Sequence, residues 1–509
     1  MGGRAGFLLV FVAAVVFLLA GAADPPPGIG AQDEAVYSHA AIGMAERGDW
    51  LTPRFLGRFF LYKPPLVYWL SAASAKLLGV SAWALRLPSV LASALTVGIV
   101  FVWVCSAAGW LRALAAVVLV GASALFVDLS RRNMTDAVVT LTIVAAAWML
   151  ARGGPSWVLA ICVAAGVLSK SIAGLIPLLI ASVWWLAAPV RPRLARLAVA
   201  AGLGLLAAAP WFVYQFVVHR QWFLGEFLGV ELLAYGASRP PQPGSGGALG
   251  FYLPRLAIDS PVLVLLVGFS LGAIVKALRT ERTPRLTALL SALAVMMAAL
   301  LAYQYHNVTY LMPLIPLLAI AAAEYAPAWG LIALAAIPVL FLVRGDSGPR
   351  IPTAVLLAEQ YCDMQRGNEL IVVGAGDEFS ISTLPLAGLR YAIPAARRHE
   401  GQVTLDFASM GIVLPVAEFN QLAAARLRYA PRLRGWGLPD DAALGSVIDW
   451  GSAEELTELV AGNPDRDFLF EDGIPAPASP HRHLRAGGAM LLLAGRALRR
   501  GPSQRACRL

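Results

Sequence analysis

Five side chains of this sequence have the types and positions needed to move a group away from a phosphate. Two of them, Asp33 and Glu34, follow the first apolar segment. Lys63 stands directly before two prolines, and Asp136 opens a later apolar segment four residues after Arg132. A carboxylate can deprotonate an incoming hydroxyl, and cations can stabilise the charge that grows on a departing phosphate. The pattern therefore predicts transfer from a phosphate-linked donor.

Charges at the ends of apolar segments also have a structural explanation, because many of them only anchor helices or pair across a loop. For Lys63, Arg131 and Arg132 the sequence leaves both interpretations open. Tyr62, beside Lys63, likewise fits an interfacial aromatic belt as well as a binding site.

The histidines and the apolar cysteines predict no metal site. His39, His219 and His306 lack the spacing of zinc ligands, so we expect structural roles for them. Cys105 and Cys162 fall inside apolar segments and are expected to be inert. No cofactor is identified, and a divalent cation is left open.

The polar stretch from Asp33 to Pro65 carries Asp33, Glu34 and Lys63 and must position their side chains. Loops longer than about 12–15 residues are usually functional or disordered. Disorder fits poorly, because aromatic residues from Trp50 to Trp69 would be costly to leave in water. We expect a folded active-site loop on the membrane surface, in which the two prolines after Lys63 fix the direction of its ammonium group.

Composition places these groups in a membrane protein. Of 509 residues, 58% are hydrophobic and only 14% are charged, whereas soluble proteins have about a quarter charged residues. The net charge of +9 comes mostly from short loops and the C-terminus. That distribution fits the positive-inside rule better than binding of nucleic acid.

The apolar segments predict a polytopic α-helical protein with about 11 to 13 transmembrane helices. Residues 6–23 contain Ala20-Gly21-Ala22 near their end, which resembles a signal-peptidase site, so a cleaved signal peptide is an alternative. Because the apolar run is long for a signal peptide, we expect an uncleaved first helix with a cytoplasmic N-terminus. The further expected spans are residues 87–111, 113–127, 137–151, 156–169, 171–190, 197–218, 256–275, 286–303, 308–323 and 325–343.

These spans predict three regions. Residues 1–343 form a membrane domain with a catalytic first outer loop at 24–86, residues 344–480 form a small extracytoplasmic α/β domain, and residues 481–509 form a basic tail. An odd number of spans places the α/β domain on the same side as the first loop, and the basic inner loops support this orientation.

The α/β domain is predicted from alternating short patterns. Strands are expected at residues 370–373, 411–414 and 468–470, and helices near 353–364, 417–427 and 453–459. Gly374-Ala375-Gly376 follows a strand, but Phe379 stands where a dinucleotide loop needs a third glycine. A disulfide between Cys362 and Cys507 is left open. The tail is either disordered or an interfacial amphipathic segment.

Several motifs together resemble the bacterial aminoarabinose transferases, which are GT-C glycosyltransferases related to the protein O-mannosyltransferases. The motifs in the first outer loop are Asp33-Glu34-x-x-Tyr37, Gly48-Asp49-Trp50-Leu51-Thr52-Pro53-Arg54, Lys63-Pro64-Pro65-Leu66-x-Tyr68-Trp69 and Arg86-Leu87-Pro88-Ser89. Later stretches of the same pattern are Arg132-x-x-x-Asp136, Lys170-Ser171-x-x-Gly174 and Tyr310-Leu311-x-Pro313.

The resemblance implies roles for individual residues. Asp33 corresponds to the catalytic aspartate, Asp136 to a second acidic residue in the next outer loop, and Lys63 to the lysine that binds the lipid phosphate. The remaining expected substrate-binding residues are Glu34, Tyr37, Tyr62, Arg132 and Tyr310.

The implied reaction is direct, inverting transfer of a sugar from a polyprenyl-phosphate donor on the periplasmic side of a bacterial inner membrane. The family commonly has glutamate where this chain has Tyr62, so aminoarabinose is not asserted as the sugar. The acceptor is expected to be lipid A or another glycolipid or glycan, with protein Ser/Thr as an alternative. A transporter or flippase for lipid-linked sugars is the non-enzyme alternative, for which Asp259 is the main candidate charge.

Overall fold

The computed structural model describes most of the first 327 residues and scattered strands beyond them. The described ranges are residues 3–22, 32–55, 58–189, 192–220, 223–224, 227–228, 247–280, 283–303, 306–327, 370–373, 391–392, 396–399, 402–407, 410–415, 457, 460–461, 464, 467–470, 481–486 and 489–494. The chain divides into two compact units. Unit 1 comprises Met1–Ala23, Leu61–Ser71 and Arg86–Asp346, and unit 2 comprises Asp24–Phe60, Ala72–Leu85 and Ser347–Leu509.

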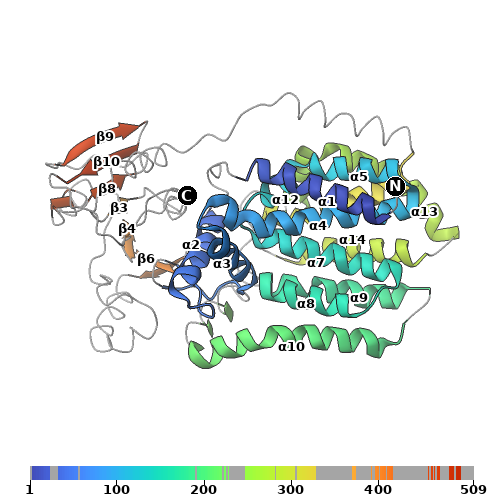
Figure 1. Cartoon of the computed structure of the whole chain (residues 1–509), viewed down its shortest axis with the longest axis horizontal. Helices are drawn as coiled ribbons and strands as arrows, with labels where there is room; N and C mark the ends of the chain where they lie inside the picture. Colours follow the sequence, from blue (N-terminus) through green and yellow to red (C-terminus); the bar gives the residue numbers. More distant parts are fainter. Residues whose placement is uncertain are drawn as a thin grey trace. The chain divides into compact units, whose positions relative to one another are not determined.

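Unit 1 is a bundle of apolar helices (Figure 1). Helix α7 packs on α8, α9 and α14; α10 packs on α8; and α15 packs on α5 and α13. The helices are α1 (Gly3–Ala20), α3 (Leu66–Leu78), α4 (Ala82–Ala108), α5 (Trp110–Gly121), α6 (Ala124–Ser130), α7 (Thr135–Arg152), α8 (Trp157–Lys170), η2 (Ser171–Leu175), α9 (Ile176–Ala187), α10 (Leu194–Val218), α12 (Gly247–Asp259), α13 (Pro261–Thr280), α14 (Pro284–Ala302), η4 (Val308–Leu311) and α15 (Leu314–Tyr325); the first residues of α3 and most of α4 belong to this unit.

The polytopic helical fold is confirmed, although the described residues contain fewer long spans than the 11 to 13 expected. Six helices are long and apolar enough to cross a membrane, or eight if each of two bent pairs counts as one span. The pairs are α5 with α6, bent by 74°, and α12 with α13, bent by 112°. The expected first span is a shorter apolar helix, Ala5–Ala20, and most of the expected span 325–343 lies outside the described residues.

One of the six long stretches, Trp157–Ala187, contains two helices that fold back on each other. Gly166 and Gly174 touch through their backbones: a Cβ on Gly166 would lie 2.8 Å from the carbonyl oxygen of Gly174. Eight residues of continuous helix would separate these glycines by about 12 Å. The chain therefore reverses after α8, as the sequence predicted from the two spans 156–169 and 171–190.

The C-terminal end of α1 is held by two arginines. Arg86 Nη1 donates to the carbonyl of Ala22 at 2.8 Å, and Arg131 Nη2 donates to the carbonyl of Phe17 at 3.0 Å. These bonds satisfy carbonyls that a helix end leaves without intrahelical partners. Ala22 itself is fully buried. The contact of Arg131 with the first helix supports its structural interpretation.

The described part of unit 2 contains α2 (Gln32–Arg47) and the hairpin of β1 (Arg54–Phe55) and β2 (Arg58–Phe59). The stretch predicted as a folded loop therefore begins with a helix. Asp33 and Glu34 occupy its first turn, where acidic groups are favourable, and Arg47 occupies its last.

The C-terminal strands of unit 2 form a five-stranded mixed sheet in the order β4-β3-β8-β10-β9 and a three-stranded sheet in the order β5-β6-β7. The three expected strands are confirmed as β3 (Leu370–Val373), β7 (Met410–Pro415) and β8 (Asp467–Phe470). The other strands are β4 (Tyr391–Ala392), β5 (Ala396–His399), β6 (Gln402–Phe407), β9 (Arg482–Ala486) and β10 (Ala489–Leu493).

The interpretation of residues from 481 onward as a tail is wrong for 482–493. The apolar run of β10 is too short to span a membrane, but it pairs with β8 on one side and β9 on the other. Asp467 Oδ1 accepts a hydrogen bond from Ala494 N at 2.7 Å and fixes the end of that strand. The expected helices at 353–364 and 417–427, nearly all of that at 453–459, and both Cys362 and Cys507 lie outside the described residues.

Candidate active site

A buried ion pair joins α7 and α8 in unit 1. Lys170 Nζ lies 2.6 Å from Asp136 Oδ1, and the two side chains are 12% and 5% exposed. The helices are antiparallel because Gly153, with φ +60°, ends α7 in a left-handed turn. The last residue of α8 therefore returns to the first turn of α7. The carboxylate also benefits from the positive end of the α7 dipole.

A strained turn sets the position of Lys170. The next residue, Ser171, has φ +42°, the only positive φ of a residue other than glycine in the described chain. Such strain persists only where the surrounding packing imposes it, and here the contact between Gly166 and Gly174 does so. A Cβ on Gly174 would overlap the backbone of Gly166 and Val167.

The ring of Tyr310 covers the lysine of this pair. Lys170 Nζ lies 4.8 Å from the ring centroid, which is cation–π distance. Tyr310 belongs to η4, whose N-terminus is capped by the Asn307 side chain, which accepts from Thr309 N at 3.0 Å. The Tyr303 ring packs against Tyr310 edge-on at 5.8 Å. We call Asp136, Lys170 and Tyr310 the charge cluster.

The segment between α6 and α7 holds Arg132 near the start of α7, but Arg132 does not pair with Asp136. Its Nη2 and Nε donate to Asp128 Oδ1 at 2.7 and 3.0 Å. The neighbouring Asn133 is fully buried and accepts from Ser71 Oγ at 2.9 Å. Asp128 therefore pairs with the arginine, and Lys170 pairs with Asp136.

Lys63 is half-buried in unit 1, beside the residue that departs from the family pattern. Its Nζ lies 5.0 Å from the centroid of the Tyr62 ring. Both following prolines are buried, and α3 begins directly after them. The carbonyl of Pro65 accepts from Trp69 N at 2.8 Å, so the lysine is attached to a rigid helix start.

Asp33, Glu34 and Tyr37 lie on α2 in unit 2. Asp33 is exposed, whereas Glu34 is fully buried and Tyr37 is buried with its ring 6.3 Å from that of Phe60. Asp33 and Tyr37 are four residues apart and share a helix face. Lys63 and Asp136 belong to unit 1, so it stays a prediction that Asp33 and Tyr37 act in the same site as these two residues.

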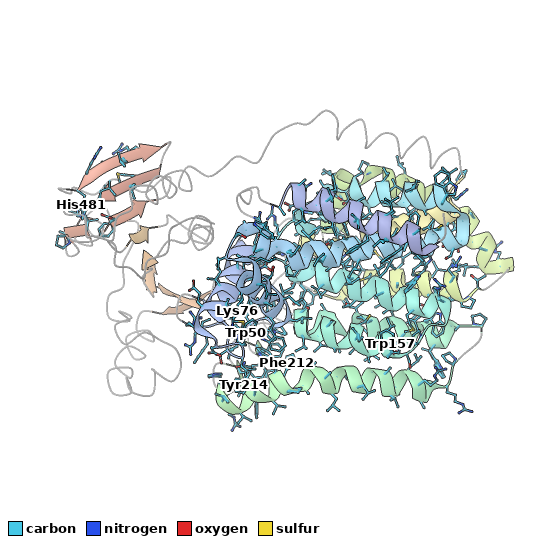
Figure 2. All side chains as sticks on the ribbon, in the orientation of Figure 1. Trp50, Lys76, Trp157, Phe212, Tyr214 and His481 are labelled. Atoms are coloured by element: carbon cyan, nitrogen blue, oxygen red, sulfur yellow. The ribbon has the colours of Figure 1, made fainter. Side chains whose placement is uncertain are left out.

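The motif from Gly48 to Arg54 builds the hairpin of unit 2. Asp49 Oδ1 accepts from Thr52 N at 3.1 Å, and Asp49 Oδ2 lies 4.0 Å from Arg54. The Arg54 guanidinium in turn covers the Phe59 ring at 4.5 Å. Trp50 lies under the ammonium of Lys76 at 5.8 Å (Figure 2). These contacts support a structural role for most of this motif.

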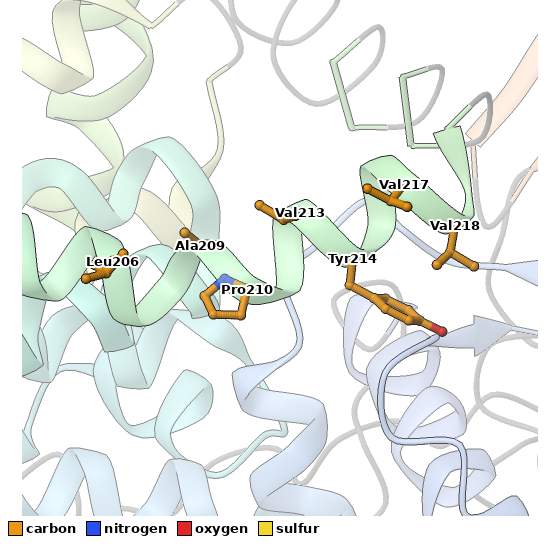
Figure 3. Close-up of a pocket in the computed structure, with 7 residues that line it drawn as sticks. All are labelled: Leu206, Ala209, Pro210, Val213, Tyr214, Val217 and Val218. Carbon is orange, nitrogen blue, oxygen red and sulfur yellow. The ribbon is translucent and has the colours of Figure 1, made fainter.

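Two other features of unit 1 contribute no reactive groups. An apolar groove runs along α10, lined by Leu206, Pro210, Val213, Tyr214 and Val217 among others (Figure 3). His306 is buried between the rings of Phe251 and Tyr252, at 5.4 and 5.5 Å, which supports a structural role.

Metal ligands do not converge in the part of the chain that the structure describes. Within those ranges no three His, Cys, Asp or Glu side chains form a group that could hold a metal ion.

Lys170 is the member of the charge cluster that the sequence analysis did not select. Two observations could have pointed to Lys170. Lys170-Ser171-x-x-Gly174 is one of the motifs that resemble the aminoarabinose transferases, and the predicted spans place Lys170 at the same membrane face as Asp136. What the sequence lacked was the registry of α7 against α8, which decides which opposite charges meet.

Comparison with known proteins agrees with the resemblance seen in the sequence. The profile of the dolichyl-phosphate-mannose-protein mannosyltransferase family matches residues 62–222. An uncharacterized protein of Aquifex aeolicus is 25% identical over 205 residues, 38% of this chain and 41% of that protein. The undecaprenyl phosphate-alpha-4-amino-4-deoxy-L-arabinose arabinosyl transferase of Aeromonas hydrophila is 30% identical over 119 residues, 22% of this chain and 21% of that enzyme. The matches thus span less than half the length of these relatives.

The fold match extends over the whole chain. The crystal structure of ArnT from Cupriavidus metallidurans bound to undecaprenyl phosphate superposes with a TM-score of 0.68 at 16% identity, covering 98% of this chain and 99% of that one. Its apo structure gives a TM-score of 0.66 at 17% identity. The chain therefore has the fold of ArnT, and its resemblance to the aminoarabinose transferases is confirmed. The six to eight apolar helices of the described residues are those of a multi-pass membrane protein.

Proposed function

We propose that this chain is a GT-C glycosyltransferase that moves a sugar from a polyprenyl-phosphate donor to an acceptor at the periplasmic face of the bacterial inner membrane. The observation that carries the proposal is the charge cluster, in which Asp136 is buried and Lys170 and Tyr310 are half-buried. It lies mostly within the residues matched by the mannosyltransferase profile. Burying two charges is costly unless their geometry is good. A polar site that the fold maintains at such cost supports a chemical role.

In the proposed reaction an acceptor hydroxyl oxygen attacks the anomeric carbon of the sugar from the side opposite the phosphate. The new glycosidic bond forms as the bond from the anomeric carbon to the phosphate oxygen breaks, and polyprenyl phosphate leaves with the bonding electrons. Asp33 takes the proton of the attacking hydroxyl. Lys63 binds the departing phosphate and stabilises its growing charge, with Arg132 as a second cation.

Asp136 and Lys170 act in this proposal as a pre-organised pair beside the sugar. An ammonium carries three donors, of which one goes to Asp136 and the π-face of Tyr310 covers another side. The pair fixes where Asp136 points, so that the carboxylate orients the acceptor or the sugar without reorganisation during the reaction. Glu34, Tyr37 and Tyr62 complete the proposed substrate contacts.

The acceptor is proposed to be lipid A or another glycolipid or glycan. The full-length fold match to ArnT and the arabinosyl transferase relatives favour this class. Transfer to protein Ser/Thr is the second candidate, favoured by the description of the matched family profile. Transport of a lipid-linked sugar is less well supported, because Asp259 binds the start of α6 and thus has a structural partner.

The proposal is tested by mass spectrometry of lipid A, surface polysaccharide and exported proteins from cells with and without this protein. Cells expressing Asp33→Asn at equal level serve as the matched control, because that variant keeps the protein but lacks the proposed base. A sugar present only with the wild-type protein identifies the acceptor. Identical glycans in all three strains would contradict the proposed function.

A further inference from the structure

The carboxylate of Asp259 lies at the start of α6, although it belongs to the last residue of α12. Asp259 Oδ2 accepts from Ser123 Oγ at 2.7 Å, and Asp259 Oδ1 accepts from Leu125 N at 2.7 Å. Ser260 Oγ donates to Oδ2 at 2.6 Å. Both oxygens of this half-buried carboxylate are therefore engaged.

These bonds complete the N-terminal cap of α6. The side chain of Ser123 accepts from Phe126 N at 3.2 Å while its hydroxyl donates to Asp259. The backbone N–H of Leu125, which a helix start leaves without an intrahelical partner, goes directly to the carboxylate. Asp259, a side chain from a distant segment, therefore accepts a backbone N–H bond at the start of α6 that a local N-cap residue accepts in most helices.

The bonds also join the two bent helix pairs of the bundle. Ser123 lies in the 74° break between α5 and α6, and Asp259 is the last residue before the 112° break between α12 and α13. A broken span has no continuous hydrogen-bond ladder to fix its angle. The carboxylate therefore sets the position of α6 relative to α12.

Both elements lead to the candidate site. Asp128 lies on α6 and forms an ion pair at 2.7 Å with Arg132, which follows the end of that helix. On α12, Tyr252 accepts from Asn307 N at 3.3 Å and so contacts the start of η4, the element that carries Tyr310. A shift of α6 against α12 would move Arg132 relative to Tyr310 and the charge cluster.

We propose that Asp259 is a positioning residue, which fixes α6 and thereby places Arg132 for the donor phosphate. The role of Arg132 rests on the proposed function, whereas the fixing of α6 by Asp259 does not. Asp259 itself touches no substrate in this proposal. A carboxylate is required because it accepts from the hydroxyls and the backbone N–H together, whereas an amide has a single acceptor oxygen.

The kinetic test uses Asp259→Asn in the wild-type and Arg132→Ala backgrounds. Asp259→Asn should raise the donor KM about tenfold in the wild-type background, with kcat changed by less than about threefold. In the Arg132→Ala background the same substitution should change KM by less than about twofold, because its effect passes through Arg132. Asp259→Glu, which keeps the charge, should recover part of the loss.

Two further variants separate positioning from loss of folding. Ser123→Ala removes one of the bonds to the carboxylate and should raise KM by about threefold. Thr283→Ala removes the cap of another span, where Thr283 Oγ1 accepts from Leu286 N at 3.2 Å, and should leave KM unchanged. Equal KM effects of Asp259→Asn in both backgrounds would overturn the placement of Arg132 by Asp259.

A readout without sugar transfer tests the fixing of α6 by itself. Ser130 is fully buried in the last turn of α6, so Ser130→Cys in a chain whose 4 native cysteines are replaced should react slowly with maleimide in detergent. Adding Asp259→Asn should speed labelling about tenfold, since a loosened helix opens more often. An unchanged rate would overturn the inference even if the enzyme is active. A faster rate in a protein that transfers no sugar would instead overturn only the proposed function.

Discussion

Removal of the Lys170 charge should destabilise the bundle strongly. Lys170→Met keeps most of the side-chain length but leaves Asp136, which is 5% exposed, without the ammonium 2.6 Å away. Breaking a buried ion pair from one side typically costs about 3–5 kcal/mol, because the remaining charge is uncompensated. The ring of Tyr310 loses its cation as well, which adds about 0.5–2 kcal/mol.

Reversible unfolding in mixed micelles of detergent and SDS measures this cost as a free energy of unfolding. Lys76→Met is the matched control, since that lysine is exposed and covers only the Trp50 ring, and it should cost at most about 1 kcal/mol. The double variant Asp136→Asn with Lys170→Met should be more stable than Lys170→Met alone, because no buried charge is left. The argument would be refuted if Lys170→Met unfolded with the free energy of the wild type. It would also be refuted if the double variant were no more stable than Lys170→Met alone.

Three further outcomes are expected. Lys63→Ala should raise the donor KM about tenfold while the protein stays folded, because a cation that holds the phosphate is lost; an unchanged KM in a transfer assay would remove Lys63 from the site. Gly174→Ala should lower the melting temperature and the folded yield, since a Cβ there would overlap the backbone of Gly166, and wild-type stability would contradict the tight turn. Cysteines at positions 45 and 400 should both react with an impermeant reagent added to intact cells with a permeabilised outer membrane, because both regions are expected outside the cytoplasm; protection of either would refute that topology.

Much of the helical fold could be predicted because its causes are local. Long apolar segments separated by basic loops indicate membrane helices whatever their tertiary partners, and Gly153 marks the end of α7 where the structure has its left-handed turn. Strands β3 and β8 are short apolar runs and were found by the same reasoning. The sequence pattern did not indicate the bends between α5 and α6 and between α12 and α13, nor the contact between Ser123 and Asp259 that joins these distant segments.

The sequence predicted most residues of the candidate site but not which of their charges form ion pairs. The structure places Asp136 in the first turn of α7, Arg132 just before that helix, and Tyr310 against Lys170. Which of the charges form ion pairs depends on how α7 and α8 are aligned, and the sequence pattern does not contain that information. Strand β10 illustrates the same limit in unit 2. Its five residues are too short for a span, and only the neighbouring strands β8 and β9 make them a central strand.

The most direct test of the proposed mechanism is the rate at which purified Asp33→Asn transfers sugar from a polyprenyl-phosphate donor. The substitution keeps the shape of the side chain and removes its charge, and Asp33 is exposed on α2. Loss of a general base typically lowers the rate by about 10²–10⁴-fold. We predict at least that loss in protein whose unfolding curve matches the wild type, with a smaller loss for Asp136→Asn. Near-normal turnover by correctly folded Asp33→Asn would contradict the assignment of the catalytic base and the mechanism built on it.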